Sequence, residues 1–342
     1  AVQQARRCPD FPELDLADLY GALGRVFDAK GNYRKSIHHF ELCLTITEKA
    51  RGQESFPYVL CAMLLALVYD KAGWMDLAIE YAERAVELRR GFLSEKHLDF
   101  INALNTLAGL CAKGKRFEQA IRAHREVLEL AECMLGKEQE LSIGALYSLS
   151  MDEIDAGDTK AALALGREAL RRNRQSAGEK SPQAASALMN LGDLYRKAGK
   201  YPKAWDCYRQ VGEIRKELTG DATLAYADTL TAMGRLAQEQ SRLSDAEQYL
   251  AEAVAWRKQH GDLQSDAYVQ DLQLLAELNS QQGAERRAIN LSKEAVEMLE
   301  KRLYAGHPRY AAAVEKMALI CEKAGYRKEA AAMLEGVATL RK

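Results

Sequence analysis

Histidine and cysteine side chains most often supply general bases, nucleophiles and metal ligands, and this sequence contains six histidines and seven cysteines. The histidines are His38, His39, His97, His124, His260 and His307. None stands in a His-Glu-x-x-His motif, and no Cys-x-x-Cys pair occurs. Adjacent side chains on a helix point about 100 degrees apart, so we expect His38 and His39 to be exposed rather than to share a metal ion.

The short motifs of common catalytic and nucleotide sites are also missing. The chain has no Gly-x-x-x-x-Gly-Lys-Ser/Thr loop, no Gly-x-Ser-x-Gly elbow and no Gly-x-Gly-x-x-Gly turn. A cysteine and a histidine from different repeats could still meet, but Cys43 and Cys111 occupy packing positions, and burial raises the pKa of a thiol. We therefore predict no catalytic residue, no cofactor and no metal, and expect that the chain is not an enzyme by itself.

The charge balance gives no general attraction to polyanions. Lysine and arginine number 48 against 49 aspartates and glutamates, a net charge of −1, so we expect no membrane binding and no direct binding to nucleic acid. The basic runs at residues 89–90 and 171–174 fall at the ends of expected helices, where cations complement the helix dipole.

The sequence also bears on cellular location. The most apolar run, residues 58–69, is too short to cross a bilayer, and the first residues lack the apolar core of a signal peptide. Free cysteines at packing positions fit a reducing compartment. We expect a cytoplasmic protein.

A repeat of 42 residues sets the elements that would position any site. A small residue recurs as Gly24, Ala66, Ala108, Ser150, Gly192, Gly234, Ala276 and Ala318, each preceded by Leu or Met, and another recurs as Ser36, Ala78, Ala120, Ala162, Ala204, Ala246, Ala288 and Ala330. Small residues let two helices approach closely, and Leu or Met fills the space between pairs. The period therefore predicts stacked helix pairs that bury one another's apolar faces.

Each repeat is expected to hold a helix, a turn and a second helix, because apolar residues recur at three- and four-residue steps on both sides of a turn residue. That residue is glycine at positions 31, 73, 114, 157, 199, 283 and 325, and serine at 241, where we expect a looser or differently ended helix. The repeats are expected at residues 15–51, 56–90, 97–135, 141–176, 182–218, 223–260, 265–302 and 308–342. Since the frame is unbroken, we interpret residues 1–342 as one elongated all-α domain.

The repeat resembles the tetratricopeptide pattern. Repeat five shows the pattern as Leu188, Leu191, Gly192, Tyr195, Ala204, Tyr208 and Val211. The 42-residue spacing, the Gly-His-Pro-Arg-Tyr-Ala segment at 306–311 and the Ala-Leu-Asn-Thr-Leu-Ala segment at 103–108 resemble the kinesin light chain and nephrocystin group. The resemblance implies a right-handed superhelical solenoid of about eight antiparallel helix pairs.

Tetratricopeptide geometry implies that places two, five, nine and twelve of each first helix line a concave groove. In repeats five to seven these places hold Ser186, Met189, Asp193, Arg196, Asp228, Thr231, Arg235, Gln238, Gln270, Gln273, Glu277 and Ser280. Over the whole groove, the candidate binding residues are Arg25, Leu60, Met63, Leu67, Asn102, Asn105, Tyr147, Met151, Met189, Asn190, Arg196 and Arg235.

The groove predicts a non-catalytic, kinesin-light-chain-like adaptor that binds a peptide or helix of another protein. The first helix of repeat two is apolar nearly all round, so a partner with apolar anchors could cover Leu60, Met63 and Leu67. Alternatively, these side chains only reach under neighbouring helices. Arg196 or Arg235 would meet an acidic flank of the partner, and the amides of Asn102 and Asn105 would hold its backbone.

A second interpretation makes the chain a regulatory or sensor arm of a larger effector, such as a caspase-like protease or a nucleotide-switch protein. Similar repeats serve that role, and catalysis would then be encoded outside this chain. The last helix carries Leu334, Val337 and Leu340 with no polar capping helix after it. We expect this C-terminal repeat to contact another domain or protein.

Overall fold

The structure is a computed structural model that describes residues 12–92, 98–218, 224–303 and 307–340. Over these ranges the chain forms α-helices and no strand. The helices are α2 (Glu13–Ala29), α3 (Tyr33–Arg51), α4 (Phe56–Ala72), α5 (Met75–Phe92), α6 (Leu98–Lys113), α7 (Phe117–Leu135), α8 (Glu140–Asp155), α9 (Thr159–Ala177), α10 (Pro182–Lys197), α11 (Tyr201–Glu217), α12 (Ala225–Glu239), α13 (Leu243–Gln259), α14 (Asp266–Gln281), α15 (Glu285–Arg302), α16 (Pro308–Lys323) and α17 (Arg327–Leu340). The predicted all-α fold of paired helices is confirmed.

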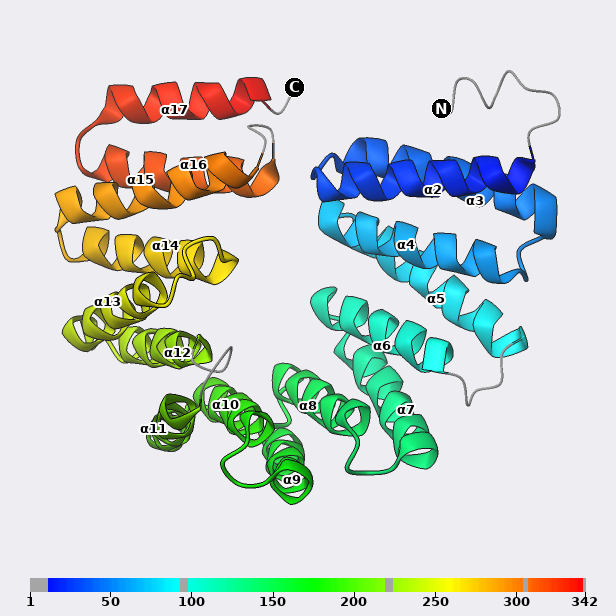
Figure 1. The fold of residues 1–342 in the computed structure, drawn as a ribbon, viewed down its shortest axis with the longest axis horizontal. Coiled ribbons are helices and arrows are strands. Elements are labelled where there is room, and N and C mark those ends of the chain that lie inside the picture. Colours follow the sequence, from blue (N-terminus) through cyan, green and yellow to red (C-terminus); the bar gives the residue numbers. More distant parts are fainter. Residues whose placement is uncertain (1–11, 93–97, 219–223, 304–306, 341–342) are drawn as a thin grey trace. The chain divides into compact units, whose positions relative to one another are not determined.

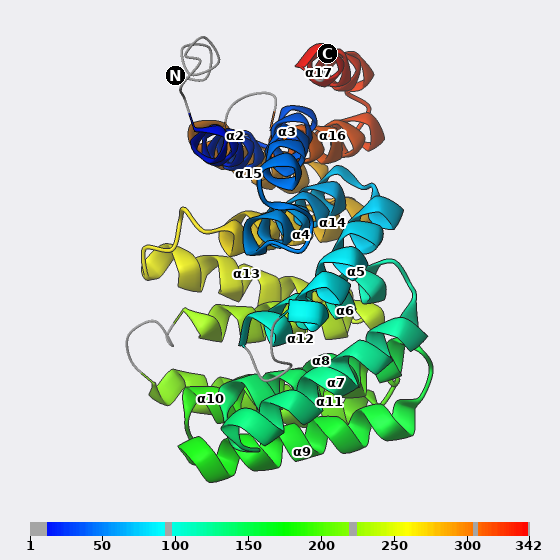
Figure 2. The same cartoon turned by 90° about the vertical axis from the view of Figure 1, so that its right-hand side faces the viewer.

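The chain divides into two compact units, residues 1–176 and 177–342. Unit 1 holds α2 to α9, apart from the last residue of α9, and unit 2 holds α10 to α17. Within each unit, short turns join the two antiparallel helices of a pair, and each pair packs on the next (Figures 1 and 2). The single-domain interpretation stays a prediction.

Apolar side chains between the stacked pairs form the core of each unit. In unit 1 one continuous cluster of buried residues runs from Ala17 on α2 to Ala145 on α8. In unit 2 a cluster centred on Leu250, Tyr268 and Leu272 joins α12, α13 and α14, and extends to α16 through Ala313. Since every pair needs its neighbours to cover it, the helices are positioned by stacking rather than by their own propensity.

The small residues of the repeat lie where two helices of a pair meet. A Cβ atom added to Gly192 would lie 2.6 Å from Cε1 of Tyr208, whose ring is fully buried. Equivalent contacts join Gly24 to Phe40 and Gly234 to Leu250, each at 2.8 Å. These glycines are present because the facing side chain occupies the space that a Cβ would need.

The same two positions hold smaller partners elsewhere in the sequence. Where the second helix carries a small residue, the first helix carries a Cβ, as in the pairs Ala66 with Ala82 and Ala276 with Ser292. This compensation is not general, because at the same spacing Ala108 stands with His124 and Ala318 with Leu334.

The turns mostly follow the predicted glycine pattern, with two corrections. Gly199 has a φ of 68°, in the left-handed region that favours glycine. In repeat three, however, Lys115 adopts the left-handed conformation with φ 59°, and Gly114 instead allows close approach of Ile79, whose Cδ1 would lie 2.8 Å from an added Cβ. Ser241 also has φ 59°, so the expectation of a different ending for its helix is wrong.

Buried arginines join second helices to neighbouring repeats. Arg215 of α11 donates to the carbonyl of Ala225 at 2.7 Å and to Thr229 Oγ1 at 3.0 Å, both at the start of α12. Burial of this guanidinium lowers the pKa of Arg215. Its hydrogen bonds tie α11 to the next repeat.

The basic runs are only partly explained by the helix dipole. Arg90 and Arg171 are exposed, as the dipole interpretation expects, but Arg89 and Arg172 are buried. Arg89 donates to the carbonyl of Asp99 in the next repeat, and Arg172 contacts Glu132 of the preceding repeat at 2.6 Å. In each run, therefore, one arginine is exposed and an adjacent arginine bonds to a neighbouring repeat.

The described histidines differ in burial. His38 is exposed, but His39 is half-buried and stacks on Phe27 with 5.2 Å between ring centroids, so its expected exposure is wrong. His124 is buried, with Nδ1 2.5 Å from Oδ2 of Asp152. His97 lies outside the described residues.

Among the six described cysteines, only Cys133 is exposed. Burial raises the pKa of the Cys111 thiol to about 11, which disfavours a reactive thiolate. The described residues include no group of three or more His, Cys, Asp or Glu side chains that could hold a metal ion. None of the described helices has the length and apolar character needed to cross a membrane.

Candidate binding groove

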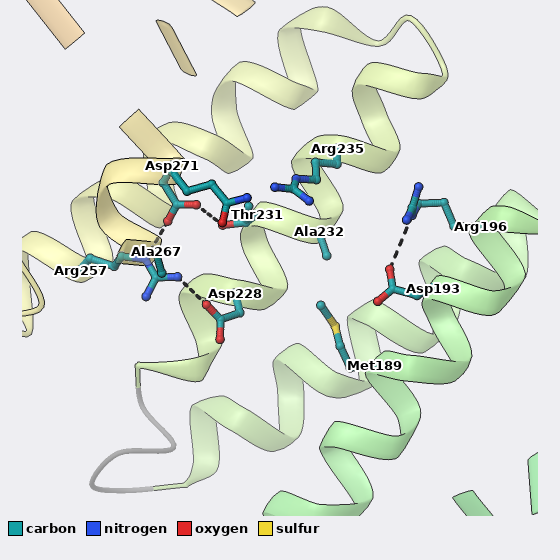
Figure 3. A pocket seen from close by; sticks show the side chains of 11 residues that line it. Met189, Asp193, Arg196, Asp228, Thr231, Ala232, Arg235, Arg257, Ala267 and Asp271 are labelled. Atoms are coloured by element: carbon teal, nitrogen blue, oxygen red, sulfur yellow. Dashed lines mark hydrogen bonds and ion pairs between the residues drawn. The ribbon is translucent and has the colours of Figure 1, made fainter. Parts of the chain in front are cut away.

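A pocket opens in unit 2 among the first helices of three consecutive repeats. Its walls come from α10, α12 and α14, and Arg257 reaches it from α13 (Figure 3). The pocket encloses about 180 Å³ and is lined by Met189, Asp193, Arg196, Asp228, Thr231, Ala232, Arg235, Arg257, Ala267, Gln270 and Asp271. Seven of these residues stand at the second, fifth, ninth or twelfth place of their repeats.

Arg257 fixes one wall of the pocket. Its Nη2 lies 2.5 Å from Asp228, its Nη1 2.8 Å from Asp262 and its Nε 2.7 Å from Asp271. Asp271 is buried and also accepts a hydrogen bond from Thr231 Oγ1 at 2.7 Å. Burial disfavours the charged guanidinium, but the hydrogen bonds that it donates to the three carboxylates outweigh this effect and raise the pKa of Arg257. The single positive charge of Arg257 is thus fully engaged by carboxylates of this chain.

Arg196 is also engaged by carboxylates of this chain. Its Nη1 lies 2.5 Å from Oε1 of Glu239, and its Nε lies 3.5 Å from Oδ1 of Asp193. Asp193 accepts a further hydrogen bond from the Tyr208 hydroxyl at 2.8 Å. Burial opposes the charge of Arg196, but the nearby Glu239 and Asp193 carboxylates outweigh it and raise the pKa of Arg196. A ligand carboxylate would have to compete with Glu239 for this guanidinium.

Arg235 differs from the other two arginines. Its side chain extends from α12 into the pocket between Thr231 and Arg196 (Figure 3). Among the described residues no carboxylate pairs with it, and its buried Nε has no hydrogen-bond partner. A buried donor without an acceptor costs about 1–3 kcal/mol. The Arg235 side chain as a whole is half-buried, so its guanidinium can pair with a ligand that supplies an acceptor.

The remaining lining supplies an apolar surface beside that guanidinium. Met189 is half-buried and extends into the pocket from α10, and Ala232 and Ala267 lie on α12 and α14 (Figure 3). A methionine side chain adapts its shape to different apolar groups. The arrangement can therefore hold an apolar side chain next to an anion.

The pocket brings together Met189, Arg196 and Arg235 of the candidate residues. Asn190 lies on the same helix as Met189 and is half-buried, but it does not line the pocket. The other candidates belong to unit 1. Within unit 1, Arg25 and Asn102 are exposed, while Asn105, Tyr147 and Met151 are half-buried.

The apolar first helix of repeat two, α4, is only partly open. Leu60 and Leu67 are 42% and 36% exposed, but Met63 is only 8% exposed and belongs to the core cluster of unit 1. The expectation that Met63 faces an open groove is therefore wrong. Because α4 is apolar nearly all round, the sequence pattern does not separate its buried face from its open one.

The C-terminal helix α17 requires a similar correction. Leu334 is 42% exposed, which agrees with the expected contact surface. Val337, however, is buried against Ala311 and Val314. The side chain of Leu340 lies outside the described residues. Val337 is therefore already covered by α16.

Sequence reasoning missed the network that shapes the groove wall. Neither Arg257 nor Asp271 was among the candidates, although both line the pocket. A signal was present, because Arg257 repeats Arg215 and Asp271 repeats Thr229 at the 42-residue spacing. A cation and a hydrogen-bond acceptor that recur together at this spacing indicate a contact that repeats between neighbouring helix pairs.

Stacked pairs of antiparallel helices define a helical-repeat protein. The tetratricopeptide repeat profile matches residues 58–132 and 142–217, and a second profile of the same repeat matches residues 17–49. The chain belongs to the tetratricopeptide repeat family.

Two relatives by sequence each cover the chain in part. A clustered mitochondria protein homolog of Emericella nidulans is 22% identical over 155 residues, which span 45% of this chain and 13% of that protein. The protein kinesin light chain-related 1 of Arabidopsis thaliana is 24% identical over 246 residues, which span 69% of this chain and 39% of that protein. The chain thus spans less than half the length of either relative.

One solved structure is similar in fold over nearly the whole of this chain. A Rap protein in complex with competence and sporulation factor matches with a TM-score of 0.51 at 12% identity, over 96% of this chain and 98% of that chain. At this identity the match shows the fold alone.

Proposed function

We propose that the groove formed by α10, α12 and α14 binds a peptide or helix of another protein that presents an acidic side chain beside an apolar one. The carboxylate pairs with Arg235, and the apolar side chain packs on Met189. The observation that carries the proposal is the contrast among the three arginines of the pocket. Arg196 and Arg257 are paired with carboxylates of this chain, whereas Arg235 has none among the described residues.

Family membership supports a role in protein interaction. Tetratricopeptide repeat proteins are generally non-catalytic scaffolds, and the similarity to a kinesin light chain-related protein agrees with an adaptor. We therefore propose a non-catalytic adaptor that acts in the cytoplasm. Its ligand is recognised by a charge-assisted hydrogen bond for specificity and by apolar burial for affinity.

The same proposal extends to unit 1. Leu60 and Leu67 are exposed on α4, and Asn102 is exposed on the next first helix, α6. Apolar anchors of a partner would pack on the two leucines, and the amide of Asn102 would bond a backbone group of the partner.

A random peptide library displayed on phage and selected against the full chain tests the proposal. We expect enriched peptides to share an acidic residue next to an apolar one. Arg235→Glu should weaken their binding about 10- to 100-fold, the range for loss of a hydrogen bond between charged groups.

Arg287→Glu is the matched control, because Arg287 lies on α15 with its side chain 75% exposed and outside the groove. It makes the same change in charge and should leave the affinity nearly unchanged. Equal losses with the two variants would show that only net charge matters. Enriched peptides without acidic residues, or the absence of any enriched peptide, would refute the proposed ligand class.

A further inference from the structure

A second cleft lies in unit 2, away from the groove, between the second helices of the last two repeats. Its floor is formed by Met317 and Cys321 of α16, and its sides by Ile289 of α15 and Met333 of α17. Arg286, Asn290, Tyr326 and Glu329 complete the lining, and the cleft encloses about 360 Å³. A cavity of roughly 150 Å³ with apolar walls is enough to hold a benzene ring.

The repeat shows what fills the equivalent place elsewhere in the same unit. Two repeats earlier, Trp205 stands where Ile289 stands in the cleft, and Tyr249 stands where Met333 stands. The rings of Trp205 and Tyr249 lie 5.7 Å apart, and the Arg242 guanidinium lies 5.2 Å from the Trp205 ring. The indole N–H of Trp205 donates to Gln240 Oε1 at 2.8 Å. There the space between second helices is occupied by an indole of this chain.

One repeat earlier, an ion pair occupies the equivalent place instead of an aromatic ring. Glu247 stands at the position of Ile289 and Arg287 at the position of Glu329. Arg287 Nη1 lies 3.2 Å from Glu247 Oε1, so that an ion pair spans the two second helices. In the last two repeats the position of Glu247 is taken by Ile289, which cannot pair with Glu329, and the cleft stays open.

We propose that this cleft binds an aromatic side chain that carries a hydrogen-bond donor, an indole or a phenol, presented by a partner polypeptide. The ring enters between Ile289 and Met333 and packs on Met317 and Cys321. The partly exposed ring of Tyr326 forms an aromatic edge of the site.

The polar lining of the cleft favours an aromatic ring that carries a hydrogen-bond donor. Glu329 supplies a carboxylate, and the structure gives it no ion pair among the described residues. This carboxylate also raises the pKa of Cys321, although burial of the thiol is the larger cause. An indole N–H or a phenol O–H can donate to Glu329, whereas a phenylalanine ring cannot, so the site favours tryptophan and tyrosine over phenylalanine.

The test uses fluoroindole as the probe and follows its fluorine NMR signal on titration with the full chain. We expect saturable binding to the wild type. Ile289→Trp should abolish binding, because the new indole occupies the cleft as Trp205 does two repeats earlier. Arg287→Trp is the matched control, since it adds the same side chain to the same helix outside the cleft, and it should bind the probe as the wild type does.

Met333→Tyr provides a second filling variant, with an aromatic ring where Tyr249 stands two repeats earlier. It should also lose the probe, so the test does not depend on one variant folding. Fluorinated N-methylindole lacks the donor and should bind about tenfold more weakly, the loss expected for one hydrogen bond to a charged acceptor. Glu329→Gln should reduce the difference between the two probes.

Three results would overturn the assignment. The first is the absence of saturable binding to the wild type, and the second is unchanged binding when both filling variants are folded. The third is dissociation of a homodimer by fluoroindole, because the cleft would then be occupied by a second copy of this chain rather than by a partner.

Discussion

Substitution of Gly192 by alanine tests how the helix pairs are built. In an exposed helix interior, Gly→Ala stabilises a protein by about 1 kcal/mol, because alanine loses less backbone entropy. At Gly192 the added Cβ would lie 2.6 and 2.9 Å from two ring carbons of Tyr208. That ring is fully buried, and its hydroxyl is bonded to Asp193 at 2.8 Å, so it has little freedom to move.

Overpacking of this kind costs about 1–3 kcal/mol. The steric cost therefore offsets or exceeds the gain in helix propensity, and Gly192→Ala should destabilise unit 2 by up to about 2 kcal/mol. The same substitution at Gly144 meets open space on α8 and should stabilise unit 1 by about 1 kcal/mol. The two variants should shift urea unfolding midpoints, followed by circular dichroism, in opposite directions.

A double-mutant cycle isolates the contact. Repeat two carries alanine at both equivalent positions, Ala66 and Ala82. In a Tyr208→Ala background the contacts with the ring are removed and only Cys207 Cβ, at 3.2 Å, stays close to the added Cβ, so Gly192→Ala should lose most of its destabilising effect. If Gly192→Ala stabilises the wild type as much as Gly144→Ala does, close approach of the two helices is not the reason for glycine at this position.

Three further predictions concern burial and charge. Met63→Glu should destabilise unit 1 by several kcal/mol because it buries a charge, whereas Leu67→Glu on the open side of α4 should leave the unfolding midpoint nearly unchanged. Equal shifts would contradict the assignment of Met63 to the buried face of α4 and of Leu67 to its exposed face. Arg257→Gln should cost about 3–5 kcal/mol, because it leaves the buried Asp271 carboxylate without its cation, and a loss below about 1 kcal/mol in urea unfolding would contradict that role. Hydrogen bonds from two arginines lower the pKa of Glu168 to about 2, so its stabilising effect should be complete above its ordinary pKa and disappear as the pH falls through the folded value. Glu168→Gln should therefore flatten the dependence of stability on pH between about 4.5 and 2, and an unchanged acid profile would exclude this contribution.

The repeat period allowed much of the fold to be predicted because packing repeats with it. Gly192 and Ala204 recur at fixed places, and their small size indicates where helices meet. In repeat three the glycine rule favoured Gly114 as the left-handed turn residue, although the period places that residue at 115, which is 42 residues after Gly73. Lys115 adopts the left-handed conformation at the regular turn position, and Gly114, one residue earlier, allows the close approach of Ile79.

The candidate site was less predictable, because it depends on pairing between repeats. The sequence presents Arg196 and Arg235 as equivalent groove cations. The structure separates them, since Glu239 of the next repeat reaches Arg196 at 2.5 Å and Arg235 receives no such partner among the described residues. Met63 could not be assigned to the right face because the helix around it is apolar on nearly every side.

The most direct test of the groove is the affinity of one selected acidic peptide for three full-length proteins, measured by isothermal titration calorimetry. These are the wild type, Arg235→Gln and Arg196→Gln. We expect Arg235→Gln to lose about 10- to 100-fold in affinity, and Arg196→Gln to lose much less, because Glu239 already occupies that guanidinium. An unchanged affinity for Arg235→Gln, or a larger loss for Arg196→Gln, would contradict a groove that recognises its ligand through Arg235.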